Sequence, residues 1–150
     1  MTIQDLTDCH YYLITRASLT VTAALKRGLA AAGARNVRPG YLGVLMALWQ
    51  EDGLKAGELG RRAGLDPSTM TGLLDRMERD VLVERRADPH DRRAQRIFLT
   101  DSGHDIEGPV NNVVDETIAA AFEGVDARDL DRLKIALRKV LANARNMGQP

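Results

Sequence analysis

Apolar residues recur every three or four positions over the first part of the chain. From residue 6 to residue 32 the repeat includes Leu13, Val21 and Leu29, and this spacing is typical of one face of an amphipathic α-helix. A glycine and an asparagine interrupt the pattern before Pro39, which suits the first position of a helix. The nearly continuous apolar run that follows, as far as residue 50, therefore predicts a second helix that lies in the interior.

Two short helices are predicted between residues 56 and 80. Gly64 can end the first in a left-handed conformation, while Asp66 and Pro67 suit the cap and the first position of the second. The apolar face of the second helix comprises Met70, Leu73, Leu74, Met77 and Val81. Its polar side carries Ser68, Gly72, Asp75 and Arg79, flanked by Thr69, Thr71 and Arg76. Helix, glycine turn and helix at this spacing predict a helix-turn-helix.

A hairpin is predicted directly after these helices. Residues 82–86 and 96–100 are two short strand-like runs, and the polar residues 87–95 join them. A hairpin in this place is a β-wing. The expected fold class is mainly α, an α+β winged helix, in which a winged helix-turn-helix head lies between N-terminal and C-terminal helices.

The polar side of the second short helix has the chemistry of a DNA-reading surface. Hydroxyl groups near its N-terminus, with the small Gly72 behind them, allow close approach to a groove and can bond phosphates and base edges. An amphipathic helix that merely covers a core would show the same period. The residues predicted to meet the major groove are Ser68, Thr69, Thr71, Gly72 and Arg76.

The hairpin carries a specific resemblance. The run DPHDRRAQRIFLT, from Asp88 to Thr100, closely resembles the wing signature of the MarR family of winged-helix transcription regulators. Asp91, Arg93 and the Leu-Thr pair that ends at Thr100 occupy the signature positions, and Ala94 stands where many members carry glycine. The two short helices also look like the DNA-binding helices of that family, so the specific motifs lie within residues 39–100.

The resemblance implies a role for each part. Arg93, together with Arg92, would enter or follow the minor groove, and Asp91 would brace the wing. The chain would be a single MarR-like domain over residues 1–150, with residues 39–100 as the DNA-binding head and residues 1–38 and 101–150 as dimerisation helices. The implied function is that of a dimeric, sequence-specific regulator of double-stranded DNA, a repressor that a small aromatic or phenolic ligand releases from a near-palindromic operator.

The C-terminal part predicts two further helices. One begins at Thr100 or Asp101 and continues to about residue 122, with Pro109 as a kink; Asp126 caps the last. The apolar stripe of the last helix comprises Leu130, Leu133, Leu137, Val140 and Leu141. Stripes at both ends of the chain are most simply buried against each other and against a second copy, which predicts a homodimer, although a monomeric bundle would carry the same stripes.

A small-molecule effector is the other partner that the resemblance implies. MarR-like proteins typically hold such ligands between the dimerisation helices and the head. Tyr41, Met46 and Trp49 are equally explained as core residues, whereas Arg16 could neutralise a ligand carboxylate. The candidate ligand-binding residues are His10, Tyr11, Arg16, Tyr41, Met46 and Trp49.

Charge and cysteine content further narrow the possible classes of function. The formal net charge is zero, yet residues 55–96 hold ten Lys or Arg against eight Asp or Glu, and arginines gather at the wing. The single cysteine, Cys9, excludes an internal disulfide. It allows an alternative, a peroxide-sensing repressor, but Arg38 stands where such regulators would carry a partner tyrosine, so an unreactive side chain is favoured.

Other classes of function find little support. His10, His90 and His104 are scattered, and neither a nucleophile elbow, a phosphate loop nor a metal-spaced cluster occurs, so we expect no enzyme, no cofactor and no metal. Without an apolar run of transmembrane length or a leader, we expect a cytoplasmic protein and no membrane partner. A winged helix that binds only proteins is the alternative from another class, and weak salt dependence of DNA retention would identify it.

Overall fold

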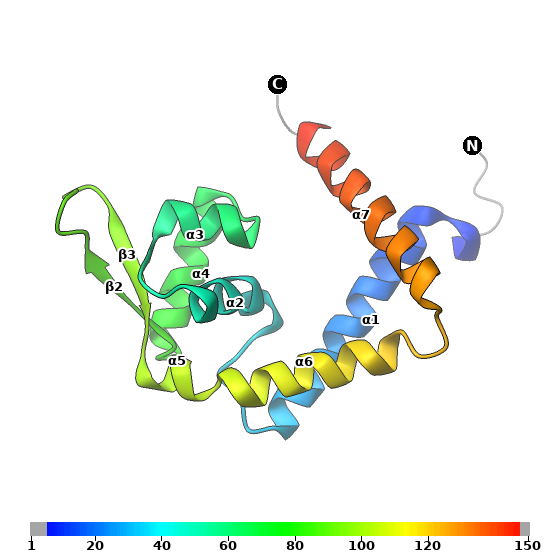
Figure 1. The fold of residues 1–150 in the computed structure, drawn as a ribbon, viewed down its shortest axis with the longest axis horizontal. Helices are drawn as coiled ribbons and strands as arrows, with labels where there is room; N and C mark the ends of the chain where they lie inside the picture. The colour runs from blue at the N-terminus through cyan, green and yellow to red at the C-terminus, as the bar shows by residue number, and fades with distance from the viewer. Residues whose placement is uncertain (1–5, 148–150) are drawn as a thin grey trace. The chain divides into compact units, whose positions relative to one another are not determined.

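The computed structural model describes residues 6–147, and the chain divides into two units, Met1–Thr117 and Ile118–Pro150, whose boundary falls within one helix. Figure 1 shows the elements in chain order. They are η1 (Leu6–Asp8), α1 (His10–Ala31), η2 (Pro39–Tyr41), α2 (Leu42–Gln50), β1 (Leu54–Lys55), α3 (Ala56–Ala63), α4 (Pro67–Arg79), β2 (Val83–Ala87), β3 (Gln95–Leu99), α5 (Asp101–Asp105), α6 (Glu107–Ala121) and α7 (Ala127–Met147). The predicted fold class, a mainly helical winged helix, is confirmed.

A small antiparallel sheet forms the wing. Its strands lie in the order β1-β3-β2, and β2 pairs with β3 from Val83 opposite Leu99 to Ala87 opposite Gln95. Each predicted wing strand is thus displaced by one residue. The sequence did not predict β1, because two residues are too few to establish an alternating pattern.

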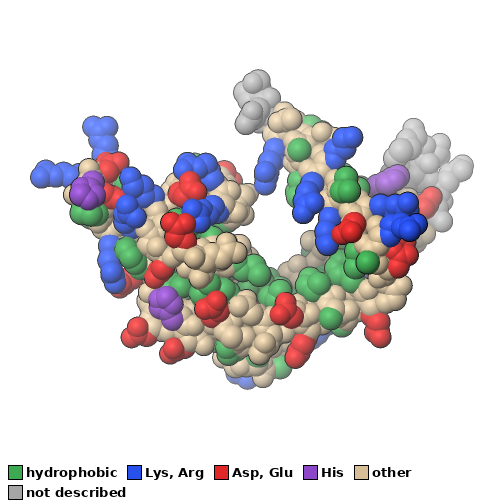
Figure 2. All heavy atoms as spheres, viewed as in Figure 1, with side chains coloured by type: hydrophobic (Ala, Val, Ile, Leu, Met, Phe, Trp, Pro, Cys, Tyr) green, Lys and Arg blue, Asp and Glu red, His purple; other side chains and the backbone are tan. Residues whose placement is uncertain are grey.

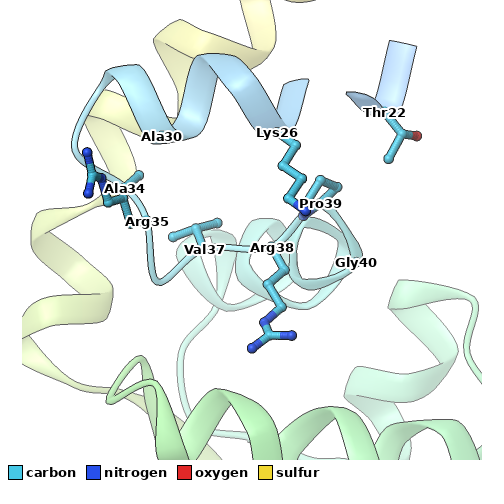
Figure 3. A pocket seen from close by; sticks show the side chains of 9 residues that line it. All are labelled: Thr22, Lys26, Ala30, Ala34, Arg35, Val37, Arg38, Pro39 and Gly40. Atoms are coloured by element: carbon cyan, nitrogen blue, oxygen red, sulfur yellow. The ribbon is translucent and has the colours of Figure 1, made fainter. Parts of the chain in front are cut away.

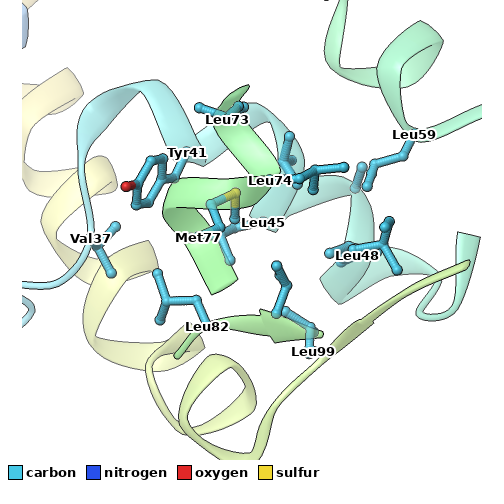
Figure 4. Packing of buried hydrophobic residues seen from close by; sticks show 14 of the residues in the cluster. Val37, Tyr41, Leu45, Leu48, Leu59, Leu73, Leu74, Met77, Leu82 and Leu99 are labelled. Atoms are coloured by element: carbon cyan, nitrogen blue, oxygen red, sulfur yellow. The ribbon is translucent and has the colours of Figure 1, made fainter. Parts of the chain in front are cut away.

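One hydrophobic core fills the head. It contains residues of α2, α3, α4 and the sheet, and it extends to the end of α1 and to α6. The members labelled in Figure 4 are Val37, Tyr41, Leu45, Leu48, Leu59, Leu73, Leu74, Met77, Leu82 and Leu99. The apolar face of α4 lies within this core, so the opposite face of α4 is left for solvent.

The end of α4 corrects one prediction. Val81 was placed on the apolar face of this helix, but it is 60% exposed. The helix ends at Arg79, and Val81 adopts a left-handed conformation with φ of 60°, which is rare for a β-branched residue. This reversal turns Leu82, rather than Val81, into the core.

The segment after the wing corrects a second prediction. A single helix with a kink at Pro109 was predicted, whereas the structure has α5 and α6, separated at Ile106. The side chain of Thr100 caps α5 by accepting a hydrogen bond from the amide of Gly103 at 3.0 Å. Pro109 falls in the first turn of α6, where a backbone N–H has no helical acceptor and its absence costs nothing.

Gly103 joins α5 tightly to the head. A Cβ atom at this position would lie 2.2 Å from the carbonyl oxygen of Leu82. The indole N–H of Trp49 donates to the carbonyl oxygen of Gly103 at 2.9 Å. Gly28 marks a second close approach, since a Cβ there would lie 2.7 Å from Cγ1 of Val113 on α6.

Two helices keep large apolar side chains in solvent. On α1 these are Tyr11, Leu13, Ile14 and Leu19; on α7 they are Leu133, Ile135, Leu137, Val140, Leu141 and Met147. Within α7 no residue is buried. Over residues 6–147, no helix combines the length and the apolar character that a membrane crossing requires.

We expect Gly103→Ala to lower the free energy of unfolding by about 1–3 kcal/mol, because the added methyl group has to displace backbone. Urea unfolding followed by circular dichroism measures the change. Gly108→Ala is the matched control, since nothing lies within 4 Å of a Cβ at that helical glycine. Equal stability of the two variants would contradict the close approach at Gly103.

Candidate nucleic-acid interface

The N-terminus of α4 is organised by one carboxylate. Asp66 accepts hydrogen bonds from the amide of Thr69 at 2.9 Å and from the hydroxyl groups of Ser68 at 2.5 Å and of Thr69 at 2.6 Å. The hydroxyl bonds, followed by the amide bond, hold the pKa of Asp66 well below its ordinary range. The predicted helix cap is therefore confirmed, and it has two additional donors.

This cap determines how the hydroxyl groups face solvent. Ser68 and Thr69 are exposed, but their protons point to Asp66. Thr71 is also exposed and donates to the carbonyl oxygen of Pro67 at 3.1 Å. With their protons engaged, the three oxygens offer lone pairs to the outside, so they are suited to accept hydrogen bonds from a base amino group.

Further along α4, Arg76 supplies the donors. Its side chain is exposed and extends back toward the N-terminus of the helix, because Nη1 would lie 3.6 Å from a Cβ placed on Gly72. The absence of a side chain at Gly72 thus leaves room beside the guanidinium group. Hydroxyl acceptors and guanidinium donors lie together on the exposed side of α4.

The wing presents two arginines to solvent. Arg92 and Arg93 lie at the tip of the β2–β3 hairpin, both are exposed, and within residues 6–147 neither forms an ion pair. Figure 2 shows Lys and Arg side chains projecting at this tip. Asp91 accepts a hydrogen bond from the amide of Arg93 at 3.0 Å, so it holds the backbone of Arg93 and leaves its guanidinium group available.

The residue that anchors the wing is Asp88, which the sequence did not identify. It is 4% exposed and accepts from the amides of His90 at 2.8 Å and Asp91 at 3.0 Å. Nε of Arg96 donates to its other oxygen at 2.6 Å, and Lys55 lies 3.9 Å away. An aspartate before a proline, followed by a turn, is the signal that could have revealed it.

The other arginines of the wing serve the fold. Arg85 pairs with Asp75 at 2.7 Å and with Glu78, so it joins β2 to α4. Asp75, on the polar side of α4, is thereby held by a residue of the wing. Arg86 pairs with Glu84 and lies over the ring of Phe98, 4.3 Å from its centroid. Of the five arginines of the wing, only the two at the tip form no ion pair with a carboxylate among the described residues. The five are Arg85, Arg86, Arg92, Arg93 and Arg96.

The six predicted ligand residues occupy different surroundings. Tyr41 is buried in the head, where its hydroxyl group donates to Asp80 at 2.6 Å, and burial, then this bond, raises its pKa. Trp49 is half-buried and Met46 is 41% exposed. His10, Tyr11 and Arg16 are exposed on α1. No hydrogen bond or ion pair between two of the six is found within residues 6–147, and they stay a prediction.

Cys9 precedes α1 as its N-cap residue and is half-buried, with no side-chain capping bond. Its redox role stays a prediction. In the part of the chain that the structure describes, no group of three or more His, Cys, Asp or Glu side chains is arranged to hold a metal ion. His104 instead faces Asp52, at 3.4 Å.

Comparison with known proteins agrees with this geometry. The family model described as MarR family matches residues 40–94. The regulator SarZ of Staphylococcus haemolyticus, an HTH-type transcriptional regulator, is 33% identical over 102 residues, which cover 67% of each chain. The HTH-type transcriptional regulator TtmR of Methylorubrum extorquens is 45% identical over 73 residues, 49% of this chain but only 37% of that regulator, so the match spans well under two thirds of its length.

A solved structure gives a longer match. The crystal structure of CouR from Rhodococcus jostii RHA1, bound to p-coumaroyl-CoA, superposes with a TM-score of 0.74 over 92% of this chain and 95% of that chain, at 25% identity. The similarity therefore extends beyond the head to the flanking helices.

We expect Asp88→Asn to destabilise the wing more than Asp91→Asn does. The substitution at the buried position 88 removes the ion pairs of the carboxylate, although the side-chain oxygen of the asparagine can still accept hydrogen bonds from the turn. The His90 amide, with help from Arg96, lowers the pKa of Asp88. Its stabilisation is therefore fully present above the ordinary pKa of about 4 and disappears as the pH falls through the lowered value.

Urea unfolding and amide hydrogen exchange in the wing measure the effect. At neutral pH the Asp88 variant should be less stable than wild type and exchange faster at residue 91, and the difference should shrink in acid. A constant difference from neutral pH down to the acid limit would contradict the assignment, as would equal behaviour of the Asp91 variant.

Proposed function

This chain belongs to the MarR family of transcription regulators, which are not enzymes, and on that premise we propose that it binds a near-palindromic operator as a homodimer and represses transcription until a small ligand releases it. Double-stranded DNA, a second copy and an effector are then its partners. The observation that carries this proposal is the arginine pair at the wing tip, which is exposed and has no ion-pair partner among residues 6–147, while the neighbouring arginines have carboxylate partners.

On the proposed operator, α4 lies in the major groove. The oxygens of Ser68, Thr69 and Thr71 accept from the amino groups of adenine or cytosine, and Arg76 donates to guanine or to a phosphate. Gly72 permits the helix to approach closely. These roles are supported by the exposed side of α4, where the hydroxyl acceptors lie near the N-terminus and Arg76 follows as the donor.

The wing arginines act in the minor groove. Arginine is favoured there because a narrow groove concentrates negative potential. Arg93 enters the groove with its backbone held by Asp91, and Arg92 contacts the adjacent phosphates. Asp88, in turn, fixes the turn from which both project.

The dimer supplies the spacing of the two heads. Recognition helices that enter successive major grooves are roughly 34 Å apart along the duplex, and a dimer interface fixes that distance. The exposed apolar side chains of α1 and α7 support this part of the proposal, because apolar stripes of this extent are normally covered by a partner.

An aromatic effector is the proposed signal. CouR, whose structure contains p-coumaroyl-CoA, supports a ligand of phenolic type here. The candidate residues are His10, Tyr11, Arg16, Tyr41, Met46 and Trp49, of which the exposed residues of α1 could contact a ligand once a second copy covers them.

We expect Arg93→Ala to lower affinity for the operator about tenfold or more, since one groove contact of this kind contributes about 1–3 kcal/mol. Fluorescence anisotropy at several salt concentrations, with promoter DNA that flanks the gene, measures it. Arg27→Ala removes an exposed arginine of α1 and serves as the control. Unchanged binding by the Arg93 variant would remove the wing from the mechanism. Weak binding by wild type without salt dependence would favour a protein-interaction module.

We expect Leu137→Glu to dissociate the dimer, raising its dissociation constant at least about tenfold, because a charge would have to be buried in the interface. Sedimentation equilibrium measures the association. Ile135→Glu is the matched control, since Ile135 is exposed on roughly the opposite side of α7. Dissociation by both variants, or by neither, would contradict the proposed stripe.

A further inference from the structure

The start of α4 is unfavourable for a DNA phosphate. Phosphates commonly bind at the N-terminus of a helix, where backbone N–H groups point outward. Here the carboxylate of Asp66 occupies that place, since it accepts from the amide of Thr69 at 2.9 Å. Among residues 6–147 no Lys or Arg forms an ion pair with Asp66. Its negative charge is therefore not offset by a cation and repels a phosphate.

Cationic side chains lie in other parts of the chain. Residues 63–75, which contain the first turns of α4, include no Lys or Arg. The tip of the wing carries one group of cations, and Figure 3 shows another, Lys26, Arg35 and Arg38, around a cavity of about 440 Å³ beside the C-terminal half of α1. Phosphate contacts therefore belong to other parts of the protein, and the start of α4 is left to meet bases.

Asp66 also determines the direction of two further hydrogen bonds. A carboxylate without its proton can only accept, so the hydroxyl groups of Ser68, 2.5 Å away, and Thr69, 2.6 Å away, both donate to it. The bond from Ser68, followed by those from Thr69, holds the pKa of Asp66 well below its ordinary range, so the carboxylate is ionised at neutral pH. Each hydroxyl oxygen then offers only lone pairs to a partner, and donation to an anion makes it a stronger acceptor.

We infer, on the basis of the proposed function, that Asp66 is a specificity-determining residue: by fixing Ser68 and Thr69 as acceptors, it restricts the bases that they read to adenine and cytosine. In the major groove the amino groups of adenine and cytosine are donors, whereas guanine and thymine offer only acceptors for hydrogen bonds. A hydroxyl oxygen that faced guanine O6 or thymine O4 would leave both atoms without a partner in a desolvated interface, which is unfavourable.

Asp66→Asn changes this polarity and keeps the helix cap. Asparagine caps helices as well as aspartate does, so its oxygen can retain the amide of Thr69. Its NH2 group donates, so a neighbouring hydroxyl oxygen accepts from it and the hydroxyl proton turns outward. The variant should therefore fold as wild type does and accept guanine or thymine where wild type rejects them.

Operator affinity across base substitutions tests the role. In promoter DNA that flanks the gene, each base pair of a half-site is replaced in turn by the other three, and fluorescence anisotropy gives the affinities. The positions read by the hydroxyl groups are those at which Ser68→Ala or Thr69→Val loses discrimination. There, wild type should prefer adenine or cytosine over guanine or thymine about fivefold or more. Purine in place of adenine, or 2-pyrimidinone in place of cytosine, should lower the affinity similarly, because both analogues lack the amino group.

Asp66→Asn should reduce the preference at these positions to less than about twofold, or reverse it. Asp105→Asn is the control for charge, since it removes an exposed carboxylate of α5, and it should keep the wild-type preference. An unchanged preference in the Asp66 variant would overturn the role of Asp66. Equal loss in the Asp105 variant would do the same, as would a wild-type preference for guanine or thymine, or discrimination that neither hydroxyl substitution alters.

The direction of the hydroxyl bonds has a test without DNA. NMR can follow the side-chain carboxyl carbon of Asp66 as the pH falls. Because donated hydrogen bonds favour the ionised form, the pKa of Asp66 should lie well below its ordinary value in wild type and rise toward it when Ser68→Ala and Thr69→Val are combined. An unchanged pKa would overturn the inferred polarity, whether or not the protein binds DNA. The expected rise without any DNA binding would refute the proposed function and the reading of bases, but not the hydrogen bonds to Asp66.

Discussion

The burial of one face of α4 is the constraint on which the rest of the head depends. Met70, Leu73, Leu74 and Met77 are each at most 5% exposed, so the helix has one possible rotation about its axis. That rotation leaves the hydroxyl groups and Arg76 in solvent. The same core receives α2, α3 and the sheet, so whatever fixes the core also fixes which side of α4 is exposed.

Ion pairs with carboxylates determine which arginines of the wing remain able to bind a ligand. Asp75 and Glu78 engage Arg85, Asp88 engages Arg96, and Glu84 engages Arg86. Most of these pairs are partly exposed, and their value lies more in geometry than in energy, because solvent screens exposed ion pairs. They join β2 to α4 and brace the wing. The tip arginines, which have no such partner among the described residues, keep their full charge for a ligand.

The two units differ in how complete their packing is. The first has a core of its own, whereas no residue of α7 is buried. A helix that exposes six large apolar residues gains little stability from burial within its own chain, since burial of an apolar face provides most of the stability of a helix in a protein. In the proposed homodimer, the packing of this helix would therefore depend on the partner as well as on its own chain.

The sequence by itself determined the order and type of most of the elements, because caps, glycine turns and apolar periodicity are local: Asp66, Gly64 and the wing motif each act within a few residues. It also pointed to the exposed residues of α4 and to the wing tip. Only the tertiary structure decided which charged residues form ion pairs. The pairs Arg85–Asp75, Asp88–Arg96 and Arg38–Asp80 join residues that are 8 to 42 positions apart in the sequence. Val81 and the break at Ile106 escaped prediction for the same reason, because packing of Leu82 and Gly103, not local propensity, set the backbone there.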